Sequence, residues 1–463
     1  MFEAETYIKR RNRLREMVGS GLILFPGNEE TPMNYRDNAY HFRQDSSFLY
    51  YFGLDSPSLA GVVDADEGKD IIFGDDADMD DIIWMGHQAL LKVRGKRVGV
   101  EETTPLSRIA DVLDQAVKEG KKIHFLPPYR PETILKLADW LHLDIQKVAL
   151  KASADLIIAL AAQRSLKTDE EIQEIEKALD VSYEMHTLAM KMAKPGVYES
   201  EITGRMEGLV LSRGFFLAFP TILTINGQIL HNHYHGNVLK EGRLLVNDSG
   251  AESDRHYASD ITRTTPVGGK FSSRQKEIYE VVLKAQTGAI DAMRPGISFR
   301  DVHLLAARTI AGGLTDLGIM KGDPEEAVDK GAHAMFFPHG LGHLMGLDVH
   351  DMENIGENYV GYGDEAQRSS QFGLSALRFA KKLEPGHVLT VEPGLYFIPD
   401  LIDLWKNEGK FTNFIDYDKV NNYRDFGGIR IEDDVLVTEN GHRILGKPIP
   451  KTIADIEKTA AEA

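Results

Sequence analysis

The alternation of apolar and polar positions changes character about one third of the way along the chain. In the first third, short apolar runs alternate with amphipathic stretches, which predicts strands at 22–25, 60–63, 71–73 and 122–126 and helices at roughly 104–119 and 131–142. Beyond residue 160 the predicted helices are longer, and β-rich sequence follows them. The pattern predicts a smaller α/β domain over residues 1–160, followed by an α+β domain over residues 161–463.

Two long amphipathic helices organise the predicted second domain. The first covers 169–193, where Thr168 and Glu171 have the spacing of a capping box, and a Pro-Gly pair at 195–196 ends it. The second covers about 272–293 and ends at a Pro-Gly pair at 295–296. Because another helix follows each of them, at 199–213 and 299–317, we expect two halves of similar layout.

Composition excludes several classes of protein. The 463 residues include no cysteine, which excludes thiol nucleophiles, disulfide scaffolds and iron–sulfur clusters and suits a cytoplasmic location. Lys and Arg number 53 against 71 Asp and Glu, and the resulting net charge of −18 repels phosphate backbones, so we expect no nucleic-acid partner. No apolar run approaches the roughly 18 residues of a membrane span. The first residues, MFEAETYIKRRNRLREM, predict an amphipathic helix rather than a signal peptide.

Four acidic residues lie inside apolar, strand-like runs of the second domain. They are Asp248, Asp260, Glu392 and Glu432. A carboxylate on a buried strand is unfavourable unless a cation or several hydrogen-bond donors compensate it. One such residue could face water, but four in one half of a domain favour a cation site.

The spacing of two of these acids predicts that they lie on the two strands of one hairpin. Asp248 and Asp260 are equidistant from Asp254, which lies in a polar stretch suited to a turn. We therefore expect the two aspartates to face each other directly, on one face and about 5 Å apart. Two anions at that distance repel each other unless a divalent cation lies between them.

Histidines gather in two short segments. His339, His343 and His350 belong to PHGLGHLMGLDVHD, where the proline and glycines argue against a zinc-binding helix, and His231 begins HNHYH. One histidine with four carboxylates is a hard ligand set that suits a pair of divalent ions, Mn²⁺, Co²⁺ or Zn²⁺. Four negative charges balance two divalent cations.

The motifs resemble the pita-bread metallopeptidases, in particular the Xaa-Pro branch of prolidases and aminopeptidases P. The matching segments are ILH (229–231), NDSGAESDRHYASDITRT (247–264), PHGLGHLMGLDVHD (338–351), LEPGHVLTVEPGLYF (383–397) and GGIRIEDDVLVT (427–438), with a weaker match at FRQDSSFLYYFGL (42–54). The resemblance implies a C-terminal pita-bread domain and a homodimer that acts on short proline-containing peptides.

The resemblance also implies a role for each site residue. The metal ligands would be Asp248, Asp260, His343, Glu392 and Glu432, with two divalent ions, Mn²⁺ first. Glu392 would also carry the proton. His231, His339 and His350 would bind substrate and stabilise the intermediate, and Arg430 would lie beside the metals.

The choice between the two activities depends on a long link before Glu392. Prolidases have such a link, with a Leu-Arg pair before Leu-x-Pro-Gly, and here that pair is Leu377-Arg378. The resemblance implies that Arg378 holds the free carboxylate of a dipeptide, which favours an Xaa-Pro dipeptidase. The alternatives are an aminopeptidase P, with Arg378 a solvated helix-surface residue, and a non-catalytic binding protein of the same fold.

Overall fold

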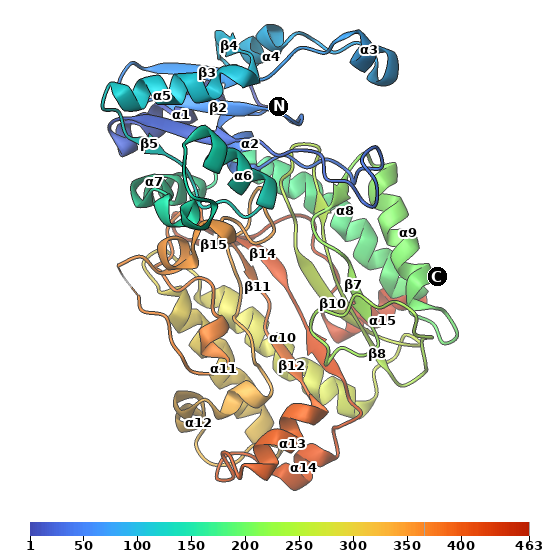
Figure 1. Ribbon diagram of the computed structural model, residues 1–463. Helices are drawn as coiled ribbons and strands as arrows, with labels where there is room; N and C mark the ends of the chain where they lie inside the picture. Colours follow the sequence, from blue (N-terminus) through green and yellow to red (C-terminus); the bar gives the residue numbers. More distant parts are fainter. Residues whose placement is uncertain (365, 463) are drawn as a thin grey trace. The chain divides into compact units, whose positions relative to one another are not determined.

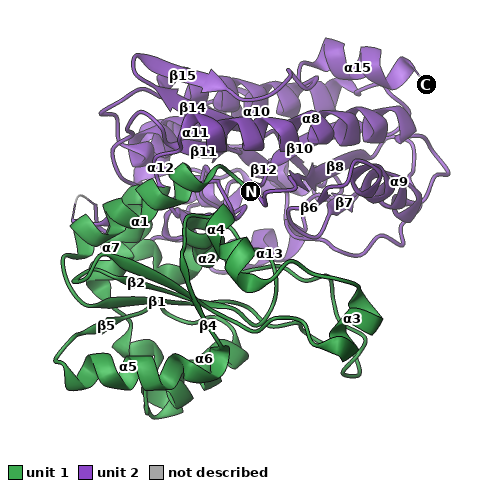
Figure 2. Ribbon diagram, turned by 90° about the horizontal axis from the view of Figure 1, so that it is seen from above, with its two compact units in different colours: residues 1–164, 352–360 green, residues 165–351, 361–463 purple. Residues whose placement is uncertain are grey.

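The computed structural model describes residues 1–364 and 366–462, and its contacts divide the chain into two compact units. Unit 1 holds residues 1–164 and 352–360, and unit 2 holds residues 165–351 and 361–463 (Figure 2). The expected boundary at residue 160 lies inside helix α7 (Ala154–Arg164), and the division falls at the end of this helix. The hydrophobic pattern gives no sign that residues 352–360 belong with unit 1.

Unit 1 is built on one mixed five-stranded sheet, in the order β4-β3-β2-β1-β5. The pairs β1–β2 and β2–β3 are antiparallel, whereas β1–β5 and β3–β4 are parallel. All four predicted strands are present, and β4 is an addition to them. The strands are β1 (Leu22–Pro26), β2 (Ala60–Asp64), β3 (Lys69–Phe73), β4 (Glu102–Thr104) and β5 (Ile123–His124).

Helices pack on this sheet through apolar side chains. Leu113 of α5 and Leu137 and Trp140 of α6 join Leu24 and Val62 in one buried cluster. Such a cluster stabilises the unit because it removes apolar surface from water. The predicted first helix is present as α1. The helices are α1 (Ala4–Val18), α2 (Ser46–Phe52), α3 (Met79–Met85), α4 (Leu91–Arg97), α5 (Ile109–Lys118), α6 (Pro131–Trp140) and α7, with 3₁₀ turns at Leu106–Arg108, Ile145–Lys147, Ala149–Lys151 and Glu353–Ile355.

The four predicted helices of unit 2 are present within one or two residues of their expected ends. The capping box before α8 forms, with the Thr168 amide donating to Glu171 and the Glu171 amide donating to Thr168. The helices are α8 (Asp169–Met192), α9 (Glu199–Ser212), α10 (Ser273–Ala292), α11 (Phe299–Asp316), α12 (Pro324–Lys330), α13 (Pro399–Asn407), α14 (Tyr417–Asn421) and α15 (Ile453–Ala461). Short helical turns lie at Ala332–Met335, Asn358–Tyr362 and Leu374–Ala376. In the described part of the chain, no helix is long and apolar enough to cross a membrane.

The strands of unit 2 form several small antiparallel sheets, and α8, α10 and α11 run along one side of them (Figures 1 and 2). Two sheets have three strands, in the orders β10-β8-β7 and β11-β14-β15, and two have a pair, β12-β13 and β6-β9. This mixed content confirms the predicted α+β class. The strands are β6 (Phe216–Leu217), β7 (Ile222–Thr224), β8 (Leu244–Ser249), β9 (Ala251–Glu252), β10 (Ile261–Pro266), β11 (Val388–Val391), β12 (Gly394–Tyr396), β13 (Gly428–Arg430), β14 (Asp433–Thr438) and β15 (Gly441–Ile444).

The expected register of the β8–β10 hairpin is wrong by two residues. Asp248 pairs with Thr262, not with Asp260. The reason lies in the turn, where the Ser253 amide donates to the Tyr257 carbonyl and His256 takes a left-handed conformation with φ of 66°. The hairpin is therefore centred on residue 255 instead of 254. Since Asp260 lies two residues before Thr262, and side chains alternate between faces, both aspartates still share a face.

Candidate active site

One cavity of unit 2, with a volume of about 590 Å³, is lined by every residue that the sequence singles out. Apolar side chains such as Phe219 and Val349 complete its wall. The predicted residues that it brings together are His231, Asp248, Asp260, His339, His343, His350, Arg378, Glu392, Arg430 and Glu432.

The four carboxylates reach this cavity from the ends of different strands. Asp248 lies on β8, Asp260 directly precedes β10, Glu392 directly follows β11, and Glu432 lies between β13 and β14. The strands themselves are buried, and their backbone hydrogen bonds fix where each acid emerges. Sequence neighbours do not meet here; the sheets collect acids that are up to 184 residues apart in the sequence, from Asp248 to Glu432.

The carboxylates destabilise one another's charged forms. Burial, followed by repulsion from neighbouring acids, raises the pKa of Asp260 and of Glu432 well above the usual range. Burial is also the main influence on Glu392, with the charge of Asp248 adding to it and Arg430 and Arg378 opposing it, and its pKa is about 8. Such a cluster favours either bound protons or a bound cation.

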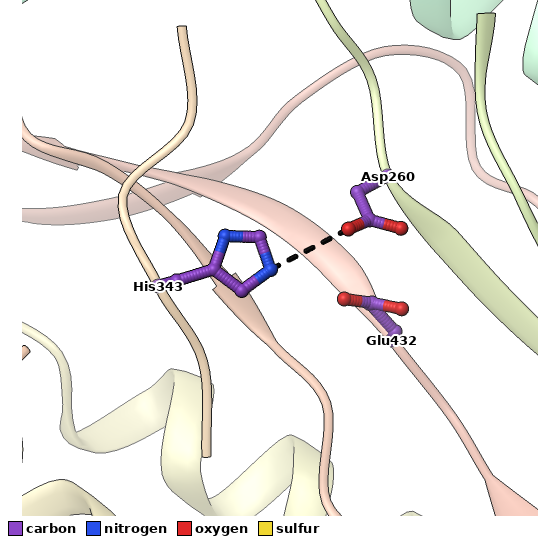
Figure 3. A group of neighbouring side chains, drawn as sticks. All are labelled: Asp260, His343 and Glu432. Atoms are coloured by element: carbon purple, nitrogen blue, oxygen red, sulfur yellow. Dashed lines mark ion pairs between the residues drawn. The ribbon is translucent and has the colours of Figure 1, made fainter. Parts of the chain in front are cut away.

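Three ligand atoms are close enough for one ion. One atom each from Asp260, His343 and Glu432 lies within 4.8 Å of the other two (Figure 3). Within residues 1–364 and 366–462, the buried Oδ1 atoms of Asp248 and Asp260 have no hydrogen-bond partner. Buried oxygens without a donor are unfavourable, and a divalent cation would satisfy them. The donor set therefore fits hard divalent ions.

His343 points one ring nitrogen at the acids and the other at the backbone. Its Nε2 lies 3.5 Å from Asp260 Oδ2 and 3.7 Å from Glu392 Oε1. Its Nδ1 donates to the Leu344 carbonyl at 3.1 Å, and its amide donates to Thr390 Oγ1. Burial lowers the pKa of His343 well below its usual value, so the ring is neutral. A neutral imidazole oriented in this way suits a metal ligand.

Arg430 closes one side of the cluster. Its guanidinium contacts Asp248 Oδ2 at 2.6 Å, the hydroxyl of Tyr396 at 2.8 Å and Thr262 Oγ1 at 3.1 Å. Thr262 in turn donates to Glu432 Oε2 at 2.6 Å. The Arg430 guanidinium therefore fixes two of the acids, Asp248 directly and Glu432 through Thr262.

His339 is held by the protein at both ring nitrogens. Nδ1 donates to the Gly340 carbonyl at 2.8 Å, which leaves Nε2 to accept from the hydroxyl of Tyr396 at 3.0 Å. Burial lowers its pKa to about 3, so the ring is neutral. Nδ1 also lies 3.8 Å from Glu392 Oε2. At that distance the two side chains are neighbours without a direct hydrogen bond.

Arg378, His231 and His350 lie in the wall of the same cavity. Arg378 is not part of a helix; it stands between Leu377 and Phe379, both 1% exposed. In an extended segment neighbouring side chains point in opposite directions, so burying these two turns Arg378 toward the cavity. The helix-surface alternative for Arg378 is therefore wrong.

Sequence reasoning missed several polar residues that hold the site. Tyr396 and Thr390 contact His339 and His343, Thr262 joins Arg430 to Glu432, and Asp434 accepts from the Asp260 amide at 3.1 Å. Asp434 carried a signal, since it is a further acid in a buried strand. The tyrosine and threonines looked like ordinary strand residues, and only their partners reveal their part in the site.

Comparison with known proteins explains this arrangement. The profile of metallopeptidase family M24 matches residues 173–439, which is more than half of the chain, and that of the aminopeptidase P N-terminal domain matches residues 7–124. The chain belongs to metallopeptidase family M24. This membership confirms the resemblance to pita-bread metallopeptidases, the predicted fold and the expectation of an enzyme.

Relatives of both predicted activities are similar along their full length. A human Xaa-Pro dipeptidase is 32% identical, over 97% of this chain and 91% of its own. An Escherichia coli Xaa-Pro aminopeptidase is 31% identical, over 98% and 97%. Among solved structures, a single-residue variant of E. coli aminopeptidase P in complex with substrate matches with a TM-score of 0.82 at 30% identity, over 100% of this chain and 99% of its own.

Proposed function

We propose that this metallopeptidase is an Xaa-Pro dipeptidase that releases proline from dipeptides. The observation that carries the proposal is Arg378, a guanidinium in the wall of the cavity that also holds the carboxylate cluster. A guanidinium binds a carboxylate through two parallel hydrogen bonds, so it would recognise the free C-terminus of a dipeptide. The second candidate is an Xaa-Pro aminopeptidase, which the equally long match to the E. coli enzyme supports.

The residues that would hold two divalent ions are Asp248, Asp260, His343, Glu392 and Glu432, as the sequence predicts. The fit rests on the two buried aspartate oxygens without donors and on the mutual repulsion of the acids. We propose Mn²⁺, with Co²⁺ or Zn²⁺ as alternatives, because oxygen ligands with one imidazole suit all three. Such a pair supplies Lewis acidity and lowers the pKa of a water molecule.

Separate protein groups would transfer the proton, stabilise the intermediate and hold the acids in place. Glu392 takes the proton from the attacking water and returns it to the proline nitrogen as the peptide bond breaks. His339, whose ring is held by Gly340 and Tyr396, lies beside Glu392 in the cavity wall and would contact the substrate there. His350 donates to the oxygen of the tetrahedral intermediate, where developing negative charge strengthens the hydrogen bond. Arg430 holds Asp248 in place.

The substrate is bound by the cavity wall. His231 and Arg378 would hold the proline carboxylate, while the neighbouring apolar side chains, such as Phe219 and Ile222, would contact the ring. Binding through the carboxylate favours a dipeptide. In a longer peptide an amide replaces the charged oxygens, and the charge-assisted hydrogen bonds are lost.

A paired rate comparison tests the proposal. The Mn²⁺-loaded protein is expected to cleave Ala-Pro with a kcat/KM at least about 10-fold higher than that for Ala-Pro-Ala, since one charge-assisted hydrogen bond contributes about 1.5–3 kcal/mol. Preferential cleavage of Ala-Pro-Ala would identify an aminopeptidase P. Inertness toward both peptides, with two equivalents of Mn²⁺ bound, would contradict both activities.

The stabilisation of the protein by Mn²⁺ is expected to increase with pH. Burial and neighbouring acids raise the pKa of Glu392 from 4.5 to about 8. Without metal, the stability linked to this raised pKa is complete below 4.5 and is lost as the pH rises through about 8. Mn²⁺ needs the ionised carboxylates, so the increase in Tm caused by Mn²⁺ should grow between about pH 6 and about pH 8. Differential scanning fluorimetry with and without Mn²⁺ measures this increase; an increase that does not change with pH would contradict the raised pKa of Glu392.

Three further expectations stay predictions. They are the homodimer, the cytoplasmic location and the absence of a nucleic-acid partner.

A further inference from the structure

A buried ion pair joins Lys167 to Asp351, the residue that follows His350. Lys167 Nζ is 2.9 Å from Asp351 Oδ2, and each side chain is only 1% exposed. A buried ion pair is often no more stabilising than an apolar pair of similar volume, because both charges lose their hydration. Stability alone therefore does not explain why a lysine and an aspartate occupy these two positions.

Asp351 is connected directly to the orientation of His343. The Asp351 amide donates to the Leu344 carbonyl at 2.9 Å, and the same carbonyl accepts from His343 Nδ1 at 3.1 Å. This carbonyl keeps the proton on Nδ1 and leaves Nε2 facing Asp260 and Glu392. A shift of Asp351 would therefore move the group that sets the tautomer and the angle of the His343 ring.

The ion pair also shapes the turn between His343 and His350. Gly346 lies against it, since a Cβ at this position would be 2.6 Å from Asp351 Oδ2 and 2.8 Å from Lys167 Cε. The Gly346 carbonyl accepts from the Ala258 amide at 2.8 Å, which joins the turn to the segment that carries Asp260. Asp351 Oδ1 accepts from the Asp348 amide at 3.4 Å. The turn thus closes around one carboxylate.

The backbone around Lys167 is held in place by the segment that leads into β11. Its amide donates to the Gly386 carbonyl at 2.8 Å, and its neighbour Leu166 pairs with His387, next to the first residue of β11. β11 leads to Thr390 and Glu392. The lysine is therefore anchored to one ligand-bearing strand while its ammonium holds the turn that bears His343.

We propose that Lys167 is a positioning residue for the metal centre, acting through Asp351 and the Leu344 carbonyl on His343. The assignment rests on the proposed function only in taking His343 as a metal ligand. It would act on metal affinity and ligand geometry even if the peptide substrate were different.

Metal binding by single and double variants tests this assignment. Lys167→Met and Asp351→Asn should each raise the dissociation constant for Mn²⁺ by about 10- to 100-fold, the usual effect of losing a group that orients a metal ligand. They should also change the visible absorption of the Co²⁺-loaded protein, which reports coordination geometry. The matched control is Lys447→Met, which removes an exposed partner of Asp180 in the same unit and should leave both readouts unchanged.

The double variant Lys167→Met/Asp351→Leu separates positioning from stability. Apolar replacement of both charges should restore a Tm that the single variants lower, yet Mn²⁺ affinity and the Co²⁺ spectrum should stay impaired. If the Mn²⁺ affinity and the Co²⁺ spectrum recovered together with the Tm, the pair would only stabilise the fold. Wild-type Mn²⁺ affinity in folded Lys167→Met would overturn the assignment, whereas a wild-type protein that binds Mn²⁺ but cleaves no Xaa-Pro peptide would overturn the proposed function alone.

Discussion

Glu392→Gln is expected to lower kcat for Ala-Pro by about 10²- to 10⁴-fold, the usual contribution of a general acid–base group. Glutamine keeps the shape of the side chain but cannot take the proton from water or return it to the proline nitrogen. Glu392 is placed for both steps, because its carboxylate lies in the cavity beside the other acids and can accept a proton from water there. The measurement is steady-state turnover of Ala-Pro in excess Mn²⁺.

The same substitution removes a proposed metal ligand, so metal content must be measured beside turnover. The Tm should stay within a few degrees of wild type, since the amide can keep its place beside His343 and His339. Glu384→Gln, in the exposed part of the segment leading to β11, is the control and should retain activity. Turnover at the wild-type rate by Glu392→Gln with two bound ions would show that another group carries the proton.

Arg378→Met is expected to remove the preference for dipeptides. Loss of a charge-assisted clamp corresponds to about 2–3 kcal/mol, so kcat/KM for Ala-Pro should fall by about 30- to 150-fold. Ala-Pro amide, which has no carboxylate, should be cleaved by both proteins at similar rates. The change should fall mainly on KM if the clamp binds the ground state and the transition state equally.

Arg368→Met is the matched control for this experiment, because Arg368 lies in the same segment but is exposed and is not among the residues that line the cavity. It should leave the ratio of the two rates unchanged. An equal loss for Ala-Pro and its amide in Arg378→Met would mean that the guanidinium acts on the carboxylate cluster instead of on the substrate. The charge of Arg378 does lower the pKa of Glu392, so the amide comparison decides between the two roles.

The local pattern predicted the long helices of the second domain and four of the five strands of the first. The Thr168 capping box and the Pro-Gly pairs delimit α8 and α10 because capping and helix termination depend on residues close in sequence. The acids inside apolar strands stood out for a similar reason: burial of a carboxylate is unfavourable wherever it occurs. Resemblance then added Arg378, Arg430 and the roles of the histidines, which periodicity alone does not indicate.

The tertiary structure decided how those residues meet. The register of β8 and β10 depends on the turn around His256, whose left-handed conformation moved the partner of Asp248 from Asp260 to Thr262. The partners of the site residues also come from distant strands: Tyr396 joins Arg430 to His339, and Lys167 meets Asp351 across 184 residues. The sequence by itself indicated which carboxylates would be unfavourable without a compensating cation, because their charge and their apolar neighbours are visible in each segment. Which of these acids meet, and what holds them in place, depended on long-range strand pairing and packing, which no local pattern contains.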